Sequence, residues 1–345
     1  MRVGVVKMIK QLSLSISLIF CLFLSCQSIA SSAPSPHFTV LPLGTSGGEL
    51  EDNLSSYLVA AFGTQDFVAL DAGTVCTAIK KIQPAIYAKI GIKAAAGDSL
   101  ASTLFAQHIK AYLISHAHLD HINGLVMCSV IDSHKDIIAT DSTIDNLRDD
   151  IFNWKIWPNL ADEGKSPQLK QYHYRRLNFA TAYALPGVQM TAQAFLLNHG
   201  NGYPSTAFLL ESKGYYLLYL GDTGADSIEH SQDILNVWQV VAPFIREHKL
   251  TAIFIEASYL NNRPDKLLFG HLRPDLLLTE LNALAKIVNS QQPATALDGL
   301  TIVVTHIKQG LEDQNIYKES VKQLNAGNHL GVKFIIPQSG QLIIF

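Results

Sequence analysis

The stretch ISHAHLDHINGLVMCSV, residues 114–130, contains three histidines and one aspartate within six positions. These four residues are His116, His118, Asp120 and His121. An apolar run, AYLIS (111–115), leads into them, and a second apolar run follows them. Imidazole and carboxylate groups are preferred ligands of zinc, and manganese and iron also accept them. The stretch therefore predicts a metal site at the end of a buried strand.

Other apolar runs of the chain also end at polar residues. His199 follows AFLLN, Asp222 follows YYLLYLG, Glu256 follows AIFI, and His306 follows TIVVT. Strands of one packed sheet end along a common edge, so we expect these side chains to meet the histidines of 114–130. A carboxylate can bridge two cations, and Asp222 is placed to do so. Two neighbouring cations would polarise a phosphoryl or carbonyl group and lower the pKa of a shared water.

The pattern of the remaining chain predicts an α/β protein, because short apolar runs alternate with longer amphipathic stretches. Strands are expected at 38–43, 56–62, 67–73, 111–115, 190–197, 205–212, 215–221, 251–257, 301–305 and 341–345. Helices are expected at 100–111, 234–248 and 274–288. Residues 132–185, which include IDNLRDDIFNWKIW and QLKQYHYRRLNF, predict a helical insertion.

Residues 1–30 have the pattern of a secretory signal peptide. A basic start and an apolar stretch lead to small residues, with Ser28 and Ala30 where cleavage after Ala30 requires them. The apolar stretch is short for a membrane span. Because LSC (24–26) resembles a lipoprotein box, a lipid anchor at Cys26 is the alternative. We expect an exported protein, either periplasmic or an outer-membrane lipoprotein.

The charge of the mature chain argues against nucleic acid as a partner. The full chain has 26 basic and 29 acidic residues, and residues 1–30 contribute three bases and no acid. The remainder carries 23 bases against 29 acids, a net charge of −6. Proteins that bind a nucleic-acid backbone need a basic surface, which this balance does not favour. A small anion at a metal site remains compatible with it.

Two of the four cysteines, Cys21 and Cys26, lie in the predicted leader, which leaves Cys76 and Cys128. In an oxidising compartment these two can form one disulfide, and two buried free thiols are an equal alternative. Their number excludes a cysteine-rich zinc scaffold.

HAHLDH (116–121), followed further along the chain by a histidine, an aspartate and a histidine, resembles the ligand pattern of the metallo-β-lactamase superfamily. LGTSGG (43–48) and LDAGT (70–74) lie where that superfamily has its glycine turn and an aspartate that supports a metal ligand. More narrowly, HAHLDHINGLVMCS is similar to the signature of class II cyclic-nucleotide phosphodiesterases, although Val130 replaces the small residue or proline usual after it.

Three further motifs match the same class: FIEASY (254–259), GHLRP (270–274) and THIK (305–308). The resemblance covers about residues 38–345. It implies an αβ/βα four-layer sandwich of the metallo-β-lactamase type, with residues 31–345 as a single catalytic domain that carries the helical insertion.

The resemblance also implies a role for each candidate residue. One metal ion would be held by His116, His118 and His199, and a second by Asp120, His121 and His306. Asp222 and a hydroxide would bridge the ions, and Asp71 would orient a ligand imidazole. The residues expected to take part in catalysis are Asp120, Asp222, Glu256 and His271. His271, positioned by Glu256, would be the general acid, by similarity to the paired Glu and GH motifs of tRNA-processing nucleases.

The reaction implied is hydrolysis of 3′,5′-cyclic AMP, with cyclic GMP also accepted, to the nucleoside 5′-monophosphate by the bridging hydroxide. The cofactors would be two divalent ions, with zinc as the first choice. Alternatives on the same fold are a secreted nuclease, lactonase or β-lactamase. A non-catalytic, metal-bearing module that binds nucleotides is an alternative of another class, and the presence of all seven ligand residues argues against it.

The expected partner is therefore a small cyclic nucleotide, with neither nucleic acid nor a membrane span. The oligomeric state stays open, with a homodimer as one option. Aromatic residues of the insertion or of the loop around Tyr203 are the candidates for base recognition. We expect the Arg263–Lys266 stretch to be merely exposed.

Overall fold

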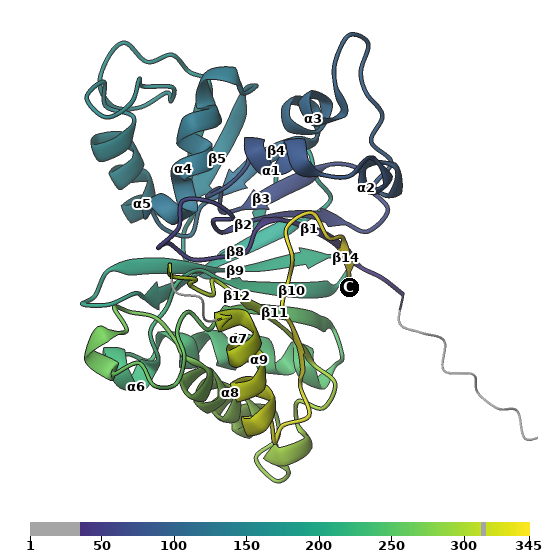
Figure 1. Cartoon of the computed structure of the whole chain (residues 1–345), viewed down its shortest axis with the longest axis vertical. Helices are drawn as coiled ribbons and strands as arrows, with labels where there is room; N and C mark the ends of the chain where they lie inside the picture. The colour runs from purple at the N-terminus through teal and green to yellow at the C-terminus, as the bar shows by residue number, and fades with distance from the viewer. Residues whose placement is uncertain (1–34, 312–314) are drawn as a thin grey trace, which may run out of the picture. The chain divides into compact units, whose positions relative to one another are not determined.

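The structure is a computed structural model that describes residues 35–311 and 315–345. The predicted signal peptide and Cys26 lie outside these residues. Pro36–Phe345 forms one compact unit, in which two β-sheets face each other and helices cover their outer sides (Figure 1). This arrangement confirms the α/β four-layer fold that the sequence predicts. In the described part of the chain, no helix is long and apolar enough to cross a bilayer.

The first sheet has seven strands in the order β14-β1-β2-β3-β4-β5-β6. In that order they are β14 (Ile343–Ile344), β1 (Phe38–Gly44), β2 (Ser56–Ala61), β3 (Phe67–Leu70), β4 (Ile109–Leu113), β5 (Lys135–Ala139) and β6 (Tyr172–Arg176). Strands β3 to β6 pair parallel. Because β3 and β4 run the same way, the residues after them, from Asp71 and from Ser115, meet at one edge.

The second sheet has the order β13-β12-β11-β10-β9-β8-β7. Its strands are β13 (Lys333–Ile335), β12 (Thr301–Thr305), β11 (Leu250–Glu256), β10 (Tyr215–Leu220), β9 (Pro204–Ser212), β8 (Thr191–Asn198) and β7 (Tyr183–Ala184). Strands β10, β11 and β12 pair parallel. β8 is separated from β10 by the antiparallel strand β9, so it ends at the same edge as they do.

The strands send alternate side chains into different apolar layers. On β2, Tyr57 and Val59 pack in the layer between the two sheets, whereas Leu58 and Ala60 face the helices outside the first sheet. Residues of a strand alternate between its two faces, so a sheet covered on both sides needs apolar residues at successive positions. This explains why the strands read as continuous apolar runs in the sequence.

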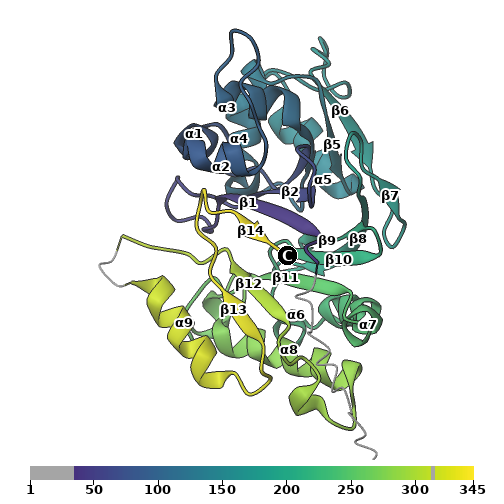
Figure 2. The same ribbon diagram turned by 90° about the vertical axis from the view of Figure 1, so that its right-hand side faces the viewer.

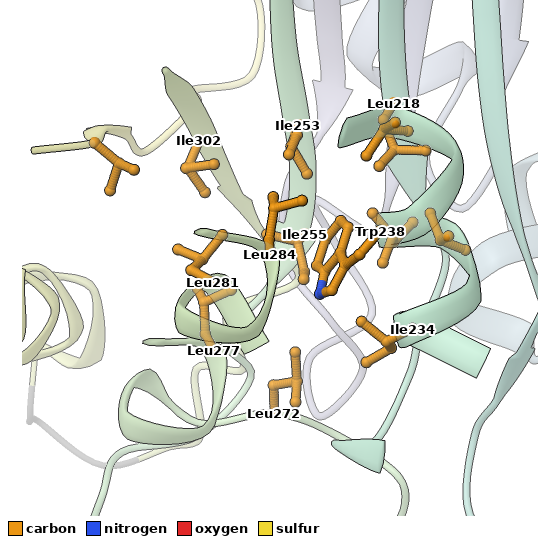
Figure 3. Close-up of a cluster of buried hydrophobic side chains, with 14 of the residues drawn as sticks. Leu218, Ile234, Trp238, Ile253, Ile255, Leu272, Leu277, Leu281, Leu284 and Ile302 are labelled. Atoms are coloured by element: carbon orange, nitrogen blue, oxygen red, sulfur yellow. The ribbon is translucent and has the colours of Figure 1, made fainter. Parts of the chain in front are cut away.

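Helices cover the outer face of each sheet, as the view in Figure 2 shows. The first group is α1 (Cys76–Lys81), α2 (Pro84–Lys89), α3 (Leu100–Thr103), α4 (Leu119–Cys128) and α5 (Asp141–Asn146). The second group is α6 (Asp226–Glu229), α7 (Asp233–Arg246), α8 (Pro274–Val288) and α9 (Ile316–Gly327). In Figure 3, Trp238 of α7 and leucines of α8 pack around Ile253 and Ile255 of β11.

Residues 132–185 do not form the helical insertion that the sequence predicts. They contribute strands β5 and β6 to the first sheet and β7 to the second, and only α5 and one π-helical turn (Leu147–Ile151) are helical. In β6, Tyr172 and Tyr174 are buried while Arg175 is exposed. This alternation has the period of a strand, and it lies in a stretch whose charges resemble those of a solvated helix.

A disulfide joins Cys76, the first residue of α1, to Cys128, the last residue of α4, with their Cα atoms 6.4 Å apart. The sequence leaves this pairing open, and the structure decides it. The bond fixes the C-terminal end of α4, the helix whose first turn carries Asp120 and His121.

Candidate metal centre

All seven residues predicted as metal ligands lie together at the edge where the strands end. His116 follows β4, and His118, Asp120 and His121 lie at the start of α4; His199, Asp222 and His306 directly follow or lie just beyond β8, β10 and β12. The centre is buried on most sides, because His116, Asp222 and His306 are at most 2% exposed. His118 is exposed, so solvent reaches the centre from the side of that residue.

The Asp222 carboxylate lies in the middle of the histidines. Its Oδ2 atom is 3.1 Å from Nε2 of His306 and 3.2 Å from Nε2 of His121. The Nε2 atoms of His116 and His199 both lie 3.7 Å from the same oxygen. One carboxylate oxygen therefore faces four imidazoles, two from each predicted ligand set. A ligand that bridges two ions needs such a position.

In the residues that the structure describes, four groups of donor atoms could hold a metal ion, and two of them consist of predicted ligands only. One contains His116, His118 and His199, and the other contains Asp120, His121, Asp222 and His306. Within each group the ligand atoms lie within 4.8 Å of one another. The first group equals one predicted set, and the second is the other predicted set together with Asp222. The two remaining groups include one or both residues of the predicted acid pair: they are His199, Asp222 and His271, and Glu256, His271 and His306.

Four of the histidines are oriented by hydrogen bonds at Nδ1, on the side away from Asp222. The contacts are His116 with Ser115 (3.0 Å), His121 with Asp71 (2.7 Å), His199 with the Gly270 carbonyl (2.8 Å) and His306 with Ser258 (2.9 Å). An imidazole that donates from Nδ1 keeps a lone pair on Nε2. Each ring therefore presents a metal-binding nitrogen to the centre, the arrangement that outer hydrogen bonds give to zinc ligands.

Asp71, the residue expected to orient a ligand, is fully buried and accepts hydrogen bonds from three residues. The Ser115 backbone N–H lies 2.7 Å and its hydroxyl 2.8 Å from the carboxylate oxygens, and the Tyr219 hydroxyl lies at 2.6 Å. The third donor is His121. Because Ser115 also accepts from His116, hydrogen bonds connect Asp71 with one predicted ligand of each metal ion.

The atoms of this centre fit divalent cations. Among the described residues, Nε2 of His116 and Oδ2 of Asp222 are buried without a hydrogen-bond partner, and leaving such groups unpaired is costly. Nε2 of His121 also faces Nε2 of His306 at 3.1 Å. With Nδ1 protonated in both rings, these nitrogens would turn lone pairs toward each other. Cations bound between these rings and the carboxylate would give each of these atoms a partner.

The electrostatics of the centre also favour positive charge. Burial alone would lower the pKa of His121, but Asp222, Asp71 and Asp120 together raise it well above its usual value. Burial would likewise raise the pKa of Asp222, yet His121 and His306 hold it well below its usual range. The carboxylates therefore remain ionised and draw positive charge into a buried site, which metal ions can supply.

Glu256 and His271, the predicted acid pair, are in direct contact. Nδ1 of His271 lies 3.0 Å from Oε1 of Glu256 and 3.8 Å from Oδ2 of Asp222. Burial raises the pKa of Glu256 to about 7, with a further contribution from Asp222. Burial lowers the pKa of His271 to about 4. Burial therefore places the pKa of the carboxyl group above that of the imidazole, which reverses the usual order of these two groups.

Ser258, for which the sequence predicts no role, connects this pair with the predicted ligands. Its hydroxyl donates to Oε2 of Glu256 at 2.5 Å and accepts from Nδ1 of His306 at 2.9 Å. Ser258 is the serine of the FIEASY motif and lies two residues after Glu256. Residues two apart along a strand point to the same side, so the spacing of Glu256 and Ser258 at the end of β11 is a signal that could identify this serine.

The glycines of LGTSGG allow the loop after β1 to approach the metal ligands closely. A Cβ atom on Gly47 would lie 2.4 Å from the imidazole of His306. The N–H of Gly48 donates to Oδ2 of Asp120 at 2.8 Å. A side chain at residue 47 would displace a ligand, so the loop needs glycine there.

A cavity of about 960 Å³ lies beside the disulfide rather than at the metal centre. Its lining includes Cys76, Cys128, Asn123 and Tyr317 and contains none of the seven candidate ligands. Cavity size therefore does not locate the candidate active site in this protein, whereas the chemistry of the donor atoms does.

Comparison with solved structures places this architecture in a known fold class. The chain is similar to unliganded yeast PDE1, with a TM-score of 0.78 and 21% identity over 90% of this chain and 100% of the other. It is also similar to the metallo-β-lactamase fold protein YhfI from Bacillus subtilis, with a TM-score of 0.54 and 16% identity over 90% of this chain and 100% of the other. The fold is that of the metallo-β-lactamases.

Sequence comparison narrows this class to one family. The model of the class-II cAMP phosphodiesterases matches residues 38–340. A 3′,5′-cyclic-nucleotide phosphodiesterase of Aliivibrio fischeri is 36% identical over 93% of this chain and 97% of its own. A probable 3′,5′-cyclic-nucleotide phosphodiesterase of Yersinia pestis is 36% identical over 91% of both chains. The chain belongs to the class-II cAMP phosphodiesterases, which confirms the family and the enzyme class that the sequence predicts.

Proposed function

We propose that this protein hydrolyses 3′,5′-cyclic AMP, and cyclic GMP as well, to the nucleoside 5′-monophosphate with two divalent metal ions as cofactors. The observation that carries the proposal is the buried Asp222 oxygen, which lies 3.1 Å from His306 and 3.7 Å from His116 in the middle of the donor groups. Membership of a family whose relatives are named cyclic-nucleotide phosphodiesterases supports the substrate.

The chain's own side chains would provide two places for a cation. His116, His118 and His199 would hold one ion, Asp120, His121 and His306 the other, and Asp222 would contact both. A donor set rich in imidazole favours zinc, which we propose as the metal. Bound ions of this kind neutralise charge on phosphoryl oxygens. They also lower the pKa of a bound water, so that hydroxide is available at neutral pH.

We assign delivery of a proton to the leaving 3′ oxygen to the pair Glu256 and His271. Opening the cyclic diester breaks the bond between phosphorus and the 3′ oxygen, which then needs a proton. His271 can donate from Nε2 while Nδ1 takes up the proton of the Glu256 carboxyl group. The pair thereby delivers one proton and ends as a carboxylate and a neutral imidazole. Ser258 positions the carboxylate through its hydrogen bond.

Hydrolysis by the purified mature protein tests this function directly. Cyclic AMP, a β-lactam, an acyl-homoserine lactone and a short RNA are incubated separately with the protein, with and without a chelator. We expect conversion of cyclic AMP to 5′-AMP, loss of this conversion with the chelator, and recovery when zinc is returned. Turnover of only the lactam, the lactone or the RNA would replace the proposed substrate. Binding of cyclic AMP without turnover would identify a nucleotide-binding module instead.

The acid role of His271 is tested with two leaving groups. His271→Ala should keep both metal ions and slow hydrolysis of cyclic AMP about 10²-fold, the usual contribution of a general acid. A nitrophenyl phosphodiester, whose leaving group needs no proton, should be slowed much less. Equal losses for the two substrates would contradict the acid role.

We also propose that the mature enzyme is exported to the periplasm, with lipidation at Cys26 as the alternative form. The leader pattern of residues 1–30 and the disulfide between Cys76 and Cys128 both support export, because structural disulfides form in oxidising compartments. Mass spectrometry of the cell-derived protein tests this. A chain that begins at Ser31 supports cleavage after Ala30, a lipidated Cys26 supports the anchored form, and an intact leader would contradict both.

A further inference from the structure

The segment Phe269–His271 is fixed to the metal centre on two sides. The carbonyl of Gly270 accepts a hydrogen bond from Nδ1 of His199 at 2.8 Å. The next residue, His271, contacts Glu256 at 3.0 Å. Phe269 is two residues from His271, so their Cα atoms lie at most about 7 Å apart. The position of Phe269 is therefore set by a ligand histidine and by the proposed acid.

Phe269 is exposed, and its backbone has a conformation that is unfavourable for a bulky residue. The residue is 64% exposed, although the neighbouring Leu268 is 1% exposed. Its φ of +52° lies in the left-handed region, where a bulky residue without a special reason is uncommon. Backbone strain of this kind concentrates at functional sites. The ring is therefore available to a ligand that binds beside the proposed acid His271.

Two further side chains connect this ring to the centre. The guanidinium of Arg263 lies 6.0 Å from the ring centroid of Phe269 and 4.4 Å from that of Tyr259. The ring of Tyr259 in turn meets His271 edge-on, with centroids 5.8 Å apart. Arg263 is held in place by a bond from Nε to the Leu267 carbonyl at 2.9 Å. Aromatic and guanidinium planes that follow one another in this way form the kind of surface on which nucleobases stack.

We propose that Phe269, supported by Arg263 and Tyr259, is the platform on which the base of the cyclic nucleotide stacks. This inference rests on the proposed function, because it places the base of the same substrate whose phosphate is at the metal centre. Every base has a π-face, so stacking predicts that adenine and guanine are both accepted. The Arg263–Lys266 stretch, which the sequence suggested was merely exposed, then contributes to substrate binding.

Tyr203, in one of the two regions that the sequence offers for base recognition, already packs against a predicted ligand. Its ring stacks on His118, with centroids 4.6 Å apart and planes inclined by 12°. Its hydroxyl accepts from the side-chain amide of Asn146 at 3.4 Å. Tyr203 therefore positions a metal-ligand histidine, and one face of its ring is covered.

The experiment compares two substrates that differ only in the base. One is cyclic AMP, and the other is a ribose 3′,5′-cyclic phosphate that carries a methoxy group in place of adenine. Phe269→Ala should raise the KM for cyclic AMP about tenfold and leave kcat unchanged, because the lost contact is made equally in the ground and transition states. The KM for the base-free diester should stay the same. Phe269→Tyr, which keeps a ring, should restore the KM for cyclic AMP.

Phe179→Ala is the matched control, because Phe179 is 47% exposed and lies between β6 and β7. It should leave both KM values unchanged. An unchanged KM for cyclic AMP in Phe269→Ala, or equal increases in KM for both substrates, would contradict base stacking on Phe269. Turnover by the wild-type protein would support the proposed function in either case. If the wild-type protein hydrolyses neither diester, the proposed function itself is wrong. A loss in Phe269→Ala that Phe269→Tyr does not reverse would also contradict stacking.

Discussion

The two sheets supply candidate ligands to the metal centre in different ways. The first sheet provides His116, His118, Asp120 and His121 from one loop and the helix that follows it. The second sheet provides His199, Asp222 and His306, one from the end of each of three strands. We call these two sets of ligands the first source and the second source. The first source is a local motif that covers six residues, whereas the second is assembled because β8, β10 and β12 run parallel.

This difference shows which part of the centre depends on the global fold. The spacing within 116–121 brings its groups close together whatever the rest of the chain does. The second set meets only if three strands end in register at one edge, so its geometry reports on the fold of the second sheet. Asp222 contacts predicted ligands from both sheets. Asp71 contacts a ligand that follows the first sheet, and Ser258 contacts one that follows the second.

The largest effect is expected from Asp222→Asn, because this change removes the carboxylate that joins the two sources. Both metal ions should be lost or weakly held, and hydrolysis of cyclic AMP should fall about 10³-fold. Metal content per chain and kcat/KM measure the result. Asp98→Asn, at an exposed aspartate of another loop, is the control and should change neither. Full metal content in Asp222→Asn would remove Asp222 from the bridging position.

The disulfide anchors the helix of the first source and should contribute strongly to stability. A bond between residues 52 positions apart lowers the entropy of the unfolded chain by an amount equivalent to about 4 kcal/mol. The double variant Cys76→Ser/Cys128→Ser should lose most of this free energy of unfolding, as measured by urea denaturation of the oxidised wild type and the variant. An unchanged midpoint of unfolding would show that the bond does not constrain α4.

Much of this architecture could be read from the sequence, for identifiable reasons. The helices at 234–248 and 274–288 were located within two residues, because their apolar residues have a clear helical period. The histidines of 116–121 and the acids and histidines at strand ends were found because each interrupts an apolar run. Their convergence followed from the general rule that parallel strands end together.

The parts that were missed depend on tertiary contacts. Tyr219 lies in an apolar strand and reads as a core residue, and only the folded structure brings its hydroxyl 2.6 Å from Asp71. The strand β6 lies among charged residues, which masked its alternation. α9 and β13 were not predicted, because the mean hydropathy of α9 is low and β13 is three residues long.

Asp71→Asn tests the orientation of the first source. An amide cannot accept from His121, Ser115 and Tyr219 in the same way, so ligands of both metal groups lose a fixed orientation. The affinity for metal should fall about 100-fold, at the upper end of the effect of such outer contacts. Titration of the metal-free protein with zinc measures this, and Tyr219→Phe, which removes only one donor, should have a smaller effect. An unchanged zinc affinity in Asp71→Asn would mean that packing alone orients these histidines.

Ser258→Ala tests the corresponding contact of the second source and should have the smallest effect. It removes the hydroxyl between His306 and Glu256, so one ligand histidine and the acid pair lose a partner while the first source is untouched. We expect about tenfold weaker zinc binding. Ser258→Thr, which keeps the hydroxyl, should behave like the wild type. Loss of activity with wild-type metal affinity would show that Ser258 acts only through Glu256.

Crystallography with anomalous scattering at the zinc edge can show whether the two sheets together hold a pair of cations around Asp222. We expect two peaks about 3.5–4 Å apart, one near His116, His118 and His199 and the other near Asp120, His121 and His306, with the Asp222 carboxylate in contact with both. Peaks remote from these residues, or a fully active protein that holds no ion there, would contradict this expectation.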